Sequence, residues 1–262
     1  MQNAFILVPV FNEEPNIPTL FESFRQLSHE LSSTLNLQFI LIDDGSQDKT
    51  VALARSQVST LCLTVLEHTE NKGPGAAFAT GFAFLAQQLK DEDWVITMEG
   101  DNTSRHELIQ QMLLRSQEGF DVVLASPYMY GGGFSQTSFL RKLLSSGANL
   151  IVKDLLDIQG ILTVSSFFRL YRGGLIRRLQ TVFGPGILER TGFESMVEMV
   201  MKMVMLQASL SEVAMQLDSS RRQGKSKMKI WRTIRGYLVL WTCKRNWASQ
   251  LSQAVLQTEA VV

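Results

Sequence analysis

Glu99 and Asp101 are the two side chains in this sequence with the clearest chemical use. They follow a short apolar run, Trp94–Met98, and a single glycine, Gly100, separates them. In an extended backbone, residues two positions apart project to the same side, and glycine lets a turn approach a ligand closely. Carboxylates are the hard oxygen donors that Mg²⁺ and Mn²⁺ prefer. The spacing therefore predicts a divalent-metal site, because capping of the next helix would explain the polar residues after Asp101 but not Glu99.

A second acidic pair, Asp43 and Asp44, follows another apolar run. Adjacent carboxylates repel each other and lose solvation at the end of a buried strand. A helix cap needs only one acceptor, and Ser46 can already cap the helix that follows. The pair therefore favours a ligand-binding role, in which a carboxylate accepts hydrogen bonds from a ribose or a base.

Polar residues also follow two further apolar runs. Asn12 and Glu13 come after the first run of the chain, where helix capping and ligand contact are equally good interpretations. Lys72 and Gly73 stand at an expected helix N-terminus, where free N–H groups can bind an anion. Neither the ending of a Walker loop nor the third glycine of the dinucleotide fingerprint is present.

Each of these polar clusters lies where an expected strand ends. Apolar runs predict strands at Phe5–Val10, Leu37–Ile42, Leu61–Leu66, Trp94–Met98 and Asp121–Ala125. Periodic segments between them predict helices at Pro15–Leu31, Ser46–Gln57, Pro74–Leu89 and Arg105–Gln117. This alternation indicates βαβ units and a mostly parallel sheet. Because such sheets bind ligands at the carboxyl ends of their strands, we expect the polar clusters to meet at one edge.

The second half of the chain is less regular. Patterns there predict helices at Ser138–Leu156 and Phe193–Leu206 and a strand at Leu210–Leu217. Nine Lys or Arg and no Asp or Glu occur from Ser219 to Trp247. From residue 229 onward, cations mix with tryptophans and aliphatics, as in an interfacial amphipathic helix or, equally, a helix packed on the protein. We therefore expect a catalytic domain at residues 1–228 and a C-terminal amphipathic helix and tail at 229–262.

The bulk composition is that of a globular protein. Of the 262 residues, 45% are hydrophobic and 19% charged, and the formal net charge is zero. We therefore expect no nucleic-acid partner. No stretch approaches the roughly 20 apolar residues of a membrane span, and the N-terminus lacks a signal-peptide pattern. We expect a cytoplasmic protein that meets the inner face of a membrane only peripherally, with Cys62 and Cys243 as buried, unpaired residues.

Taken together, the motifs at Val8–Glu14, Leu41–Thr50, Asn71–Ala77 and Ile96–Ser104 resemble those of family 2 glycosyltransferases over roughly residues 4 to 230. The sequence looks most similar to the polyprenyl-phosphate (dolichyl-phosphate) mannosyltransferase-like group. This resemblance implies the α/β GT-A fold, which is Rossmann-like, with a mostly parallel central sheet flanked by helices. It also implies inverting transfer of a sugar from a nucleotide sugar, GDP-mannose or UDP-hexose, to an acceptor.

The resemblance further implies roles for individual residues. The residues expected to bind the nucleotide sugar are Pro9, Phe11, Asn12, Glu13, Asp43, Asp44, Lys72, Gly73 and Gly100. Glu99 and Asp101 match the Asp-x-Asp metal motif, with Mg²⁺ or Mn²⁺ as the implied cofactor, although Glu99 replaces the first Asp. Arg221 and Lys227 match the ends of an Arg-x-x-Gly-x-Ser-Lys motif and join Asp101 as the residues expected to act on the leaving diphosphate.

The acceptor is addressed by a separate set of residues. A sugar hydroxyl needs a general base, whereas a lipid phosphate is ionised at pH 7 and needs only cations to position it. No histidine stands in a suitable position for a base, and Arg141 and Arg169 are candidate acceptor cations. These points favour a polyprenyl phosphate. The carboxylates that stay open as alternative bases are Asp154, Asp157, Glu194 and Glu198.

Other functions remain open from the sequence. An enzyme of the same fold can act on a polysaccharide or a small-molecule hydroxyl. A non-catalytic relative that only binds a nucleotide sugar is compatible with the departures from the family pattern at Glu99, Pro127, Thr163 and Phe167. Metal-dependent hydrolysis of the donor would separate an enzyme from such a binder. A nucleotidyltransferase would need a Gly-rich, basic loop after the first strand, where this chain has Asn12-Glu13-Glu14.

Overall fold

The computed structural model describes residues 1–262 except 136–148, 150–152, 155–157, 222, 224–229 and 260–262. Most of the helix expected at Ser138–Leu156 lies outside the described residues, as do Arg141 and Lys227.

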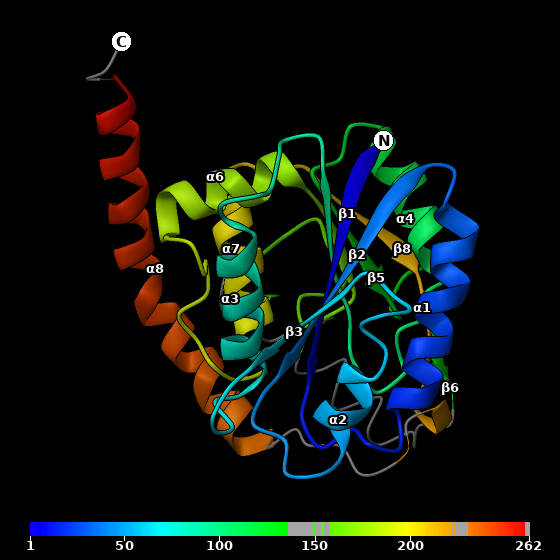
Figure 1. Cartoon of the computed structure of the whole chain (residues 1–262). Coiled ribbons are helices and arrows are strands. Elements are labelled where there is room, and N and C mark those ends of the chain that lie inside the picture. The colour runs from blue at the N-terminus through cyan, green and yellow to red at the C-terminus, as the bar shows by residue number, and fades with distance from the viewer. Residues whose placement is uncertain (136–148, 150–152, 155–157, 222, 224–229, 260–262) are drawn as a thin grey trace.

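The chain alternates strands and helices through its first half (Figure 1). In chain order the elements are β1 (Gln2–Val10), α1 (Ile17–Leu31), β2 (Leu35–Asp43), α2 (Thr50–Arg55), β3 (Leu63–Glu67), α3 (Pro74–Leu85), β4 (Trp94–Thr97), α4 (Leu108–Gln117), β5 (Val122–Ser126) and β6 (Gly133–Ser135). They continue with β7 (Arg169–Arg172), α6 (Gly173–Phe183), α7 (Ser195–Met205), β8 (Leu210–Ala214), β9 (Gln216–Asp218), the 3-10 turn η1 (Ser219–Arg221) and α8 (Ile230–Glu259). Every strand and helix expected before residue 126 is present, with small differences at the ends.

Seven strands form one sheet in the order β3-β2-β1-β4-β7-β5-β8. Strand β7 runs antiparallel to β4 and β5, and all other neighbouring pairs in this sheet are parallel. The mostly parallel sheet expected from the sequence is therefore confirmed. Strand β7 was not expected, because its sequence Arg-Leu-Tyr-Arg places charged residues at both ends and contains no apolar run. A short two-stranded sheet of β6 and β9 lies apart from the main sheet.

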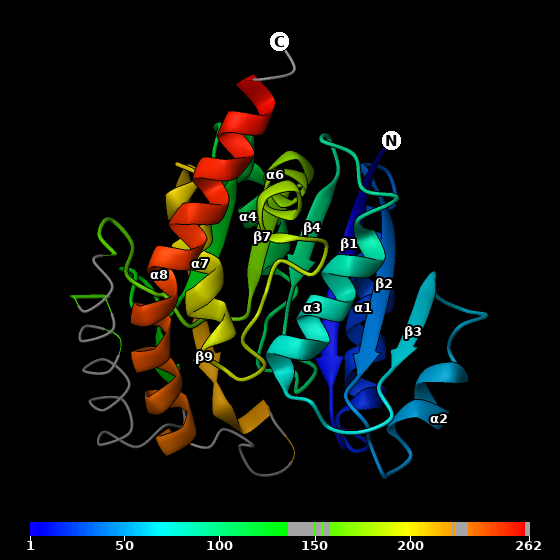
Figure 2. The same ribbon diagram turned by 90° about the vertical axis from the view of Figure 1, so that its left-hand side faces the viewer.

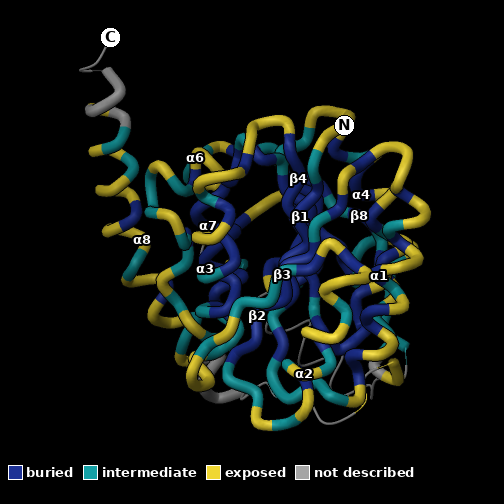
Figure 3. The backbone as a smooth tube through the Cα atoms, viewed as in Figure 1, coloured by how far each residue is buried: buried dark blue, intermediate teal, exposed yellow. Residues whose placement is uncertain are grey.

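Helices cover both faces of the sheet because the side chains of each central strand alternate between the two faces. On β1, Phe5 and Leu7 enter one core with residues of α3, α6, α7 and α8. Ala4, Ile6 and Val8 enter the opposite core with residues of α1 and α4. Figure 2 shows α3, α7 and α8 in front of the sheet, and Figure 3 shows that its central strands are largely buried.

The polar clusters expected at strand ends do meet at one edge of the sheet. Strand β1 pairs with β2 up to Val10 and Asp43, and β2 pairs with β3 up to Asp43 and Glu67. Strand β4 lies on the other side of β1 and ends at Thr97. The antiparallel β7 begins at the same edge, because Arg169 pairs with Thr97. The parallel topology therefore gathers the loops after four strands around a single carboxyl edge.

Helix α8 packs along α6 and α7 and continues past the body of the protein (Figure 1). Leu240 and Trp247 are fully buried in the core, whereas Leu238 and Trp241 on its other side are 58% and 61% exposed. Within the described chain, no helix has both the length and the hydropathy needed to cross a membrane. The expectation that both cysteines are buried is wrong: Cys62 is exposed, between the buried Leu61 and Leu63, and Cys243 is only partly buried.

Candidate active site

A cavity of about 410 Å³ opens beside the carboxyl ends of β1, β2 and β3. The residues that line it are Phe11, Asp43, Gly45, Ser46, Gln47, Val51, Glu67, His68, Thr69, Glu70 and Asn71. It combines the Phe11 ring with several polar and acidic side chains, which suits a polar small molecule that carries a flat ring. Two of the residues expected to bind a nucleotide sugar, Phe11 and Asp43, therefore line the same cavity, and Pro9 lies next to them at the end of β1.

Asp43 holds a buried carboxylate with unused hydrogen-bonding capacity. The residue is 2% exposed, and its Oδ2 accepts hydrogen bonds from the N–H groups of Gly45 and Ser46 at 3.1 and 2.9 Å. Its other oxygen, Oδ1, is buried and has no hydrogen-bond partner among the described residues. A buried acceptor without a partner costs free energy unless a ligand supplies the donor. This oxygen is therefore the acceptor of the cavity that a ligand would satisfy.

Both carboxylate oxygens of Asp44, in contrast, have partners within the protein. Its Oδ1 accepts from Lys72 N at 2.9 Å and contacts Nδ1 of His68 at 2.8 Å, while its Oδ2 accepts from Gly73 N at 2.7 Å. The Nε2 atom of His68 in turn contacts Oγ1 of Thr80 at 2.8 Å. The two adjacent aspartates thus have different roles. Asp44 holds the loop after β3 in place, and Asp43 faces the cavity.

Three N–H groups around the start of α3 are already hydrogen-bonded within the protein. Lys72 N and Gly73 N donate to Asp44, and Gly75 N donates to the carbonyl of Thr191 at 2.8 Å. Gly75 also needs its lack of a side chain, because a Cβ there would stand 2.2 Å from the carbonyl oxygen of Arg190. The backbone N–H of Lys72 is thus in use, and its exposed side chain is the part that can contact a ligand.

Asn12 and Glu13 join the loop after β1 to the loop after β2. Asn12 N donates to Oγ of Ser46 and its Oδ1 accepts from Gln47 N, both at 2.8 Å, while Glu13 N donates to Oγ1 of Thr50 at 2.8 Å. Asn12 has a left-handed backbone with φ of +50°, which asparagine tolerates better than most residues. The sequence predicted that this helix begins at Ser46. Helix α2 begins at Thr50 instead, because the residues between them bond to the loop after β1.

Glu99 and Asp101 follow β4 beside the end of β1. Asp101 is 8% exposed, and its Oδ1 accepts from Thr103 N at 3.1 Å and from Thr103 Oγ1 at 2.5 Å. Glu99 pairs through Oε2 with the hydroxyl of Ser104. Gly100 lies against β1 so closely that a Cβ would meet Val10 Cγ1 at 2.6 Å, so this turn accepts only glycine without a shift. The turn therefore holds both carboxylates in fixed orientations.

The chemistry of this acidic pair fits a divalent cation. Carboxylate oxygens suit Mg²⁺ and Mn²⁺, and the hydrogen bonds from Thr103 and Ser104 would orient the two groups in the way that outer-shell partners orient metal ligands. Among the described residues, no group of three His, Cys, Asp or Glu side chains is arranged to hold a metal. Mg²⁺ commonly takes one or two carboxylates and completes its shell with water and substrate phosphates, so a two-carboxylate site fits a metal that binds together with a diphosphate.

Arg221 brings a positive charge to the same edge. Burial raises the pKa of Glu107, but a backbone hydrogen bond and the charges of His106, Arg105 and Arg221 outweigh it and leave the pKa below its ordinary value. The hydrogen bonds of Ser220, with smaller help from Arg221 and Arg105, likewise lower the pKa of Asp218. Arg105, which was not singled out in the sequence, therefore stands with Arg221 as a second exposed cation.

Arg169 is the candidate acceptor cation that the structure describes. It is fully buried, and it donates from Nε to Ser166 O at 2.7 Å and from Nη2 to Val164 O at 2.8 Å. Its Nη1 is buried without a hydrogen-bond partner in the described part of the chain. Since β7 starts at the carboxyl edge, the backbone of Arg169 stands at the end of the sheet where the candidate site lies.

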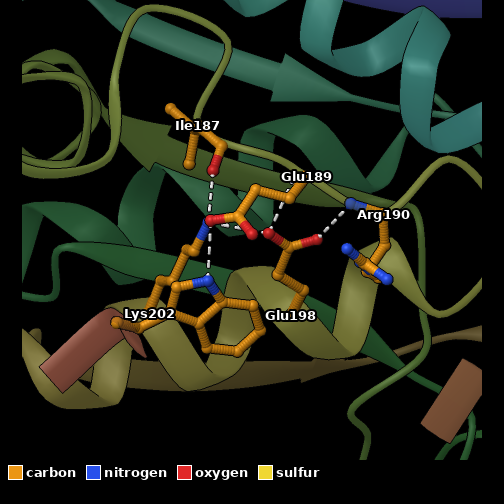
Figure 4. Close-up of polar contacts among 6 residues, drawn as sticks. Ile187, Glu189, Arg190, Glu198 and Lys202 are labelled. Atoms are coloured by element: carbon orange, nitrogen blue, oxygen red, sulfur yellow. Dashed lines mark hydrogen bonds and ion pairs between the residues drawn. The ribbon is translucent and has the colours of Figure 1, made fainter. Parts of the chain in front are cut away.

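A buried ion pair supports the loop that contacts α3 (Figure 4). Glu198 accepts from the N–H groups of Glu189 and Arg190, each at 2.8 Å, and from Nζ of Lys202 at 2.7 Å. Lys202 also donates to Ile187 O at 2.6 Å. Glu198 and Lys202 are both fully buried. Glu198, which the sequence left open as a base, is thus engaged in holding residues 187–190.

The start of α8 packs on the same region. Gly236 lies so close to Glu194 that a Cβ would stand 2.7 Å from its carboxyl carbon and would require the Glu194 side chain to shift. Burial raises the pKa of the neighbouring Tyr237 to about 12, with the charge of Glu194 adding to the effect. Further along α8, Trp247 donates from Nε1 to Glu189 at 2.8 Å. These contacts tie α8 to the loop before α7.

A family model described as "Glycosyl transferase family 2" matches residues 5–179. The dolichol-phosphate mannosyltransferase of Pyrococcus furiosus is 27% identical over 257 residues, covering 95% of this chain and 66% of that protein. The polyprenol monophosphomannose synthase of Mycolicibacterium smegmatis is 24% identical over 233 residues, covering 87% of this chain and 81% of that protein. This chain thus spans slightly less than two thirds of the first relative's length.

Solved structures of other proteins have a fold similar to that of this chain. Glucosyl-3-phosphoglycerate synthase from Mycobacterium tuberculosis, in complex with Mn²⁺, uridine diphosphate and phosphoglyceric acid, has a TM-score of 0.61 at 15% identity and covers 92% of this chain and 78% of that one. Mannosyl-3-phosphoglycerate synthase from Rubrobacter xylanophilus has a TM-score of 0.57 at 13% identity, covering 95% and 76%. At these identities the similarity concerns the fold.

Proposed function

This chain belongs to glycosyl transferase family 2 and has the GT-A fold, and we propose that it transfers a hexose from a nucleoside-diphosphate sugar to a polyprenyl phosphate. The observation that carries the proposal is the meeting, at one edge of the sheet, of a cavity containing an unpartnered carboxylate oxygen and an acidic pair suited to a metal. The relatives named for dolichol-phosphate and polyprenol-phosphate mannose transfer support the choice of mannose and of a lipid phosphate.

On the donor side, the nucleoside would enter the cavity beside Phe11. Asp43 would accept a hydrogen bond from a ribose hydroxyl or a base N–H through its unpartnered Oδ1. Asp44 would act indirectly, by holding the loop of Lys72 and Gly73 in shape. The nucleoside diphosphate is thereby directed along the carboxyl edge toward the turn that carries Asp101.

The diphosphate is the leaving group, so its negative charge must be offset as the glycosidic bond breaks. Glu99 and Asp101 would hold a divalent cation, which when bound supplies Lewis-acid stabilisation of that charge. Arg221 would add a cation from the opposite side of the diphosphate, in the manner of charge-assisted phosphate contacts. The C-terminal end of its motif, Lys227, lies outside the described residues.

On the acceptor side, the nucleophile would be an oxygen of the lipid phosphate. Such an oxygen is already ionised, so the protein needs to position it rather than deprotonate it. Arg169 supplies a buried guanidinium whose Nη1 has no partner among the described residues, and Arg141, outside the described residues, stays a candidate second cation. A single displacement from the face opposite the diphosphate would invert the anomeric carbon.

We also propose that residues 229–262 bring the catalytic part, residues 1–228, to the membrane surface where a polyprenyl phosphate resides. The outer side of α8 exposes Leu238, Val239 and Trp241 at 58%, 40% and 61%, next to the exposed cations Arg235 and Lys244. Mixed apolar and basic faces of this kind bind the headgroup region of anionic bilayers.

A donor screen by calorimetry tests the proposed function. GDP-mannose, UDP-glucose and UDP-GlcNAc are each titrated with and without Mn²⁺, and the transfer of a radiolabelled hexose to polyprenyl phosphate in vesicles is then measured. We expect one donor to bind in a metal-dependent way and to be used for transfer to the lipid. Binding without transfer or hydrolysis would favour a nucleotide-sugar-binding protein, and no binding at all would refute the proposal.

The two adjacent aspartates give a sharper prediction. Asp43→Asn should weaken nucleoside-diphosphate binding by about 10-fold or more, because one hydrogen bond to a charged group contributes roughly 1.5–3 kcal/mol, while the thermal midpoint stays nearly constant. Asp44→Asn should instead lower the thermal midpoint, because it disturbs the three contacts that shape the loop after β3. Calorimetry and thermal unfolding of both variants check this, and equal effects of the two on binding would contradict the division of roles.

A further inference from the structure

Asn16 stands at the N-cap position of α1 but does not cap it. The residue immediately precedes Ile17, and its side chain makes no capping hydrogen bond to the helix. Asparagine is among the preferred N-cap residues because its side-chain oxygen accepts from the first turn. Asn16 is also fully buried, although asparagine is mostly found at the surface. Its side chain is therefore used for something other than capping.

The side-chain amide of Asn16 instead forms hydrogen bonds with the backbone of Gln223, which is 207 positions away in the sequence. Oδ1 of Asn16 accepts from Gln223 N at 2.9 Å, and Nδ2 of Asn16 donates to Gln223 O at 3.0 Å. This two-way pairing uses the donor and the acceptor of one residue's backbone at once. An amide side chain provides a donor and an acceptor on two separate atoms, whereas an ionised carboxylate only accepts and a hydroxyl has both functions on a single atom.

Asn16 also contacts the two loops of the candidate active site. Its Nδ2 donates to Oε2 of Glu13 at 2.5 Å, and its backbone carbonyl accepts from Nδ2 of Asn102 at 3.0 Å. Asn102 directly follows Asp101 and has a left-handed backbone with φ of +65°. Strained positions of this kind persist where their surroundings hold them. Three segments, those of Glu13, of Asp101 and of Gln223, therefore meet at one buried residue, the first and third through its side chain and the second through its backbone carbonyl.

Gln223 lies two positions after Arg221, so fixing its backbone also fixes where the Arg221 guanidinium can reach. We propose that Asn16 is a positioning residue that holds Arg221 in register with the turn carrying Glu99 and Asp101. This inference rests on the proposed function, because Arg221 matters there as the cation on the leaving diphosphate. Asn16 is not among the residues that line the cavity, so it would act through the segments it joins.

A variant whose side chain suits the N-cap position but cannot pair with the backbone of Gln223 separates this role from a structural one. Serine is a good N-cap residue but has no amide to pair with Gln223. Asn16→Ser should therefore keep its thermal midpoint within about 4 °C of wild type, while kcat for donor turnover falls about 10- to 100-fold, the cost of a small misplacement of a catalytic group. The KM for the donor should change less than kcat, because Asp43 and the cavity are untouched. Asn36→Ser, at an exposed asparagine that bonds to Asn3, serves as the matched control and should change neither.

A double-mutant cycle then tests whether Asn16 acts through Arg221. If it does, the variant carrying both Asn16→Ser and Arg221→Ala should turn over the donor no more slowly than Arg221→Ala alone. Hydrogen exchange of the Gln223 amide, measured in the same proteins without donor, should speed up in Asn16→Ser and stay unchanged in Asn36→Ser.

The outcomes separate the inference from the proposed function. Multiplicative effects of the two substitutions on kcat, or an unchanged kcat in Asn16→Ser, would overturn the positioning role while leaving an active wild type as support for the proposed function. A wild type that turns over none of the donors would instead refute the proposed function. The positioning role would then be refuted too, even if the Gln223 amide exchanged faster in Asn16→Ser.

Discussion

Replacing Asp101 with asparagine should reduce donor turnover by about 100- to 1,000-fold, the usual cost of removing a group that stabilises charge in the transition state. The substitution removes one of the two negative charges that would hold the metal. It retains an oxygen that can accept from Thr103 N and Oγ1, as Oδ1 of Asp101 does now at 3.1 and 2.5 Å. The turn after β4 should therefore keep its shape, and the loss should lie in kcat and in metal-dependent donor binding. Turnover of the donor in a range of Mn²⁺ concentrations measures both.

The matched control for this variant is Asp91→Asn at the opposite edge of the sheet. Asp91 precedes β4, and its side chain is 69% exposed in an ion pair with Arg177. This change removes the same charge from the same protein, so it should leave turnover within about two-fold of wild type, as expected of a weak surface ion pair. Full activity in Asp101→Asn would mean that the acidic pair after β4 is not part of the reaction.

Replacing Lys202 with methionine should lower the free energy of unfolding by about 3–5 kcal/mol, the typical cost of breaking a buried ion pair from one side. The substitution leaves the fully buried carboxylate of Glu198 without its cation. It also removes the donor to the carbonyl of Ile187, a β-branched residue held at a φ of +63°. The cation that lies 4.7 Å from the centre of the Trp247 ring is lost as well, which should loosen α8. Chemical denaturation measures the difference.

Two further variants show whether the cost comes from the stranded charge. Adding Glu198→Gln to Lys202→Met removes the uncompensated carboxylate, so the double variant should be more stable than the sum of the two single losses predicts. Arg177→Met breaks an exposed ion pair and should cost less than about 1 kcal/mol. A Lys202→Met variant as stable as Arg177→Met would show that the buried pair contributes little.

The stability of Lys202→Met should also depend on pH. Burial raises the pKa of Glu198 above its ordinary value of 4.5, and Lys202 acts against this shift. Without Lys202 the folded protein retains a proton that the unfolded chain releases above pH 4.5, so the folded state binds more protons and stability falls as pH rises. The destabilisation relative to wild type should therefore be smaller at pH 5 than at pH 8, and a pH-independent difference would contradict this cause.

The sequence alone determined the layout of the fold's first half. Apolar runs and helical periodicity are local patterns, and they located five strands and four helices before residue 126. Parallel βαβ units have all their carboxyl ends on one edge, so the order of elements was sufficient to bring Asp43, Asp44, Glu99 and Asp101 together. The same argument did not reveal β7, whose strand conformation depends on its two neighbours in the sheet rather than on its own sequence.

Only the tertiary structure decided which role each residue at that edge has. Asp43 and Asp44 are adjacent and chemically identical, and they differ only because Lys72, Gly73 and His68 approach one of them and not the other. Asn16 reads as an ordinary helix cap until Gln223 returns to it from 207 positions away. Glu198 and Lys202 read as a surface pair one helical turn apart until α8 covers them. A hydrogen bond between distant segments leaves no local pattern in the sequence, because each partner keeps its own local propensity whether or not the other is present.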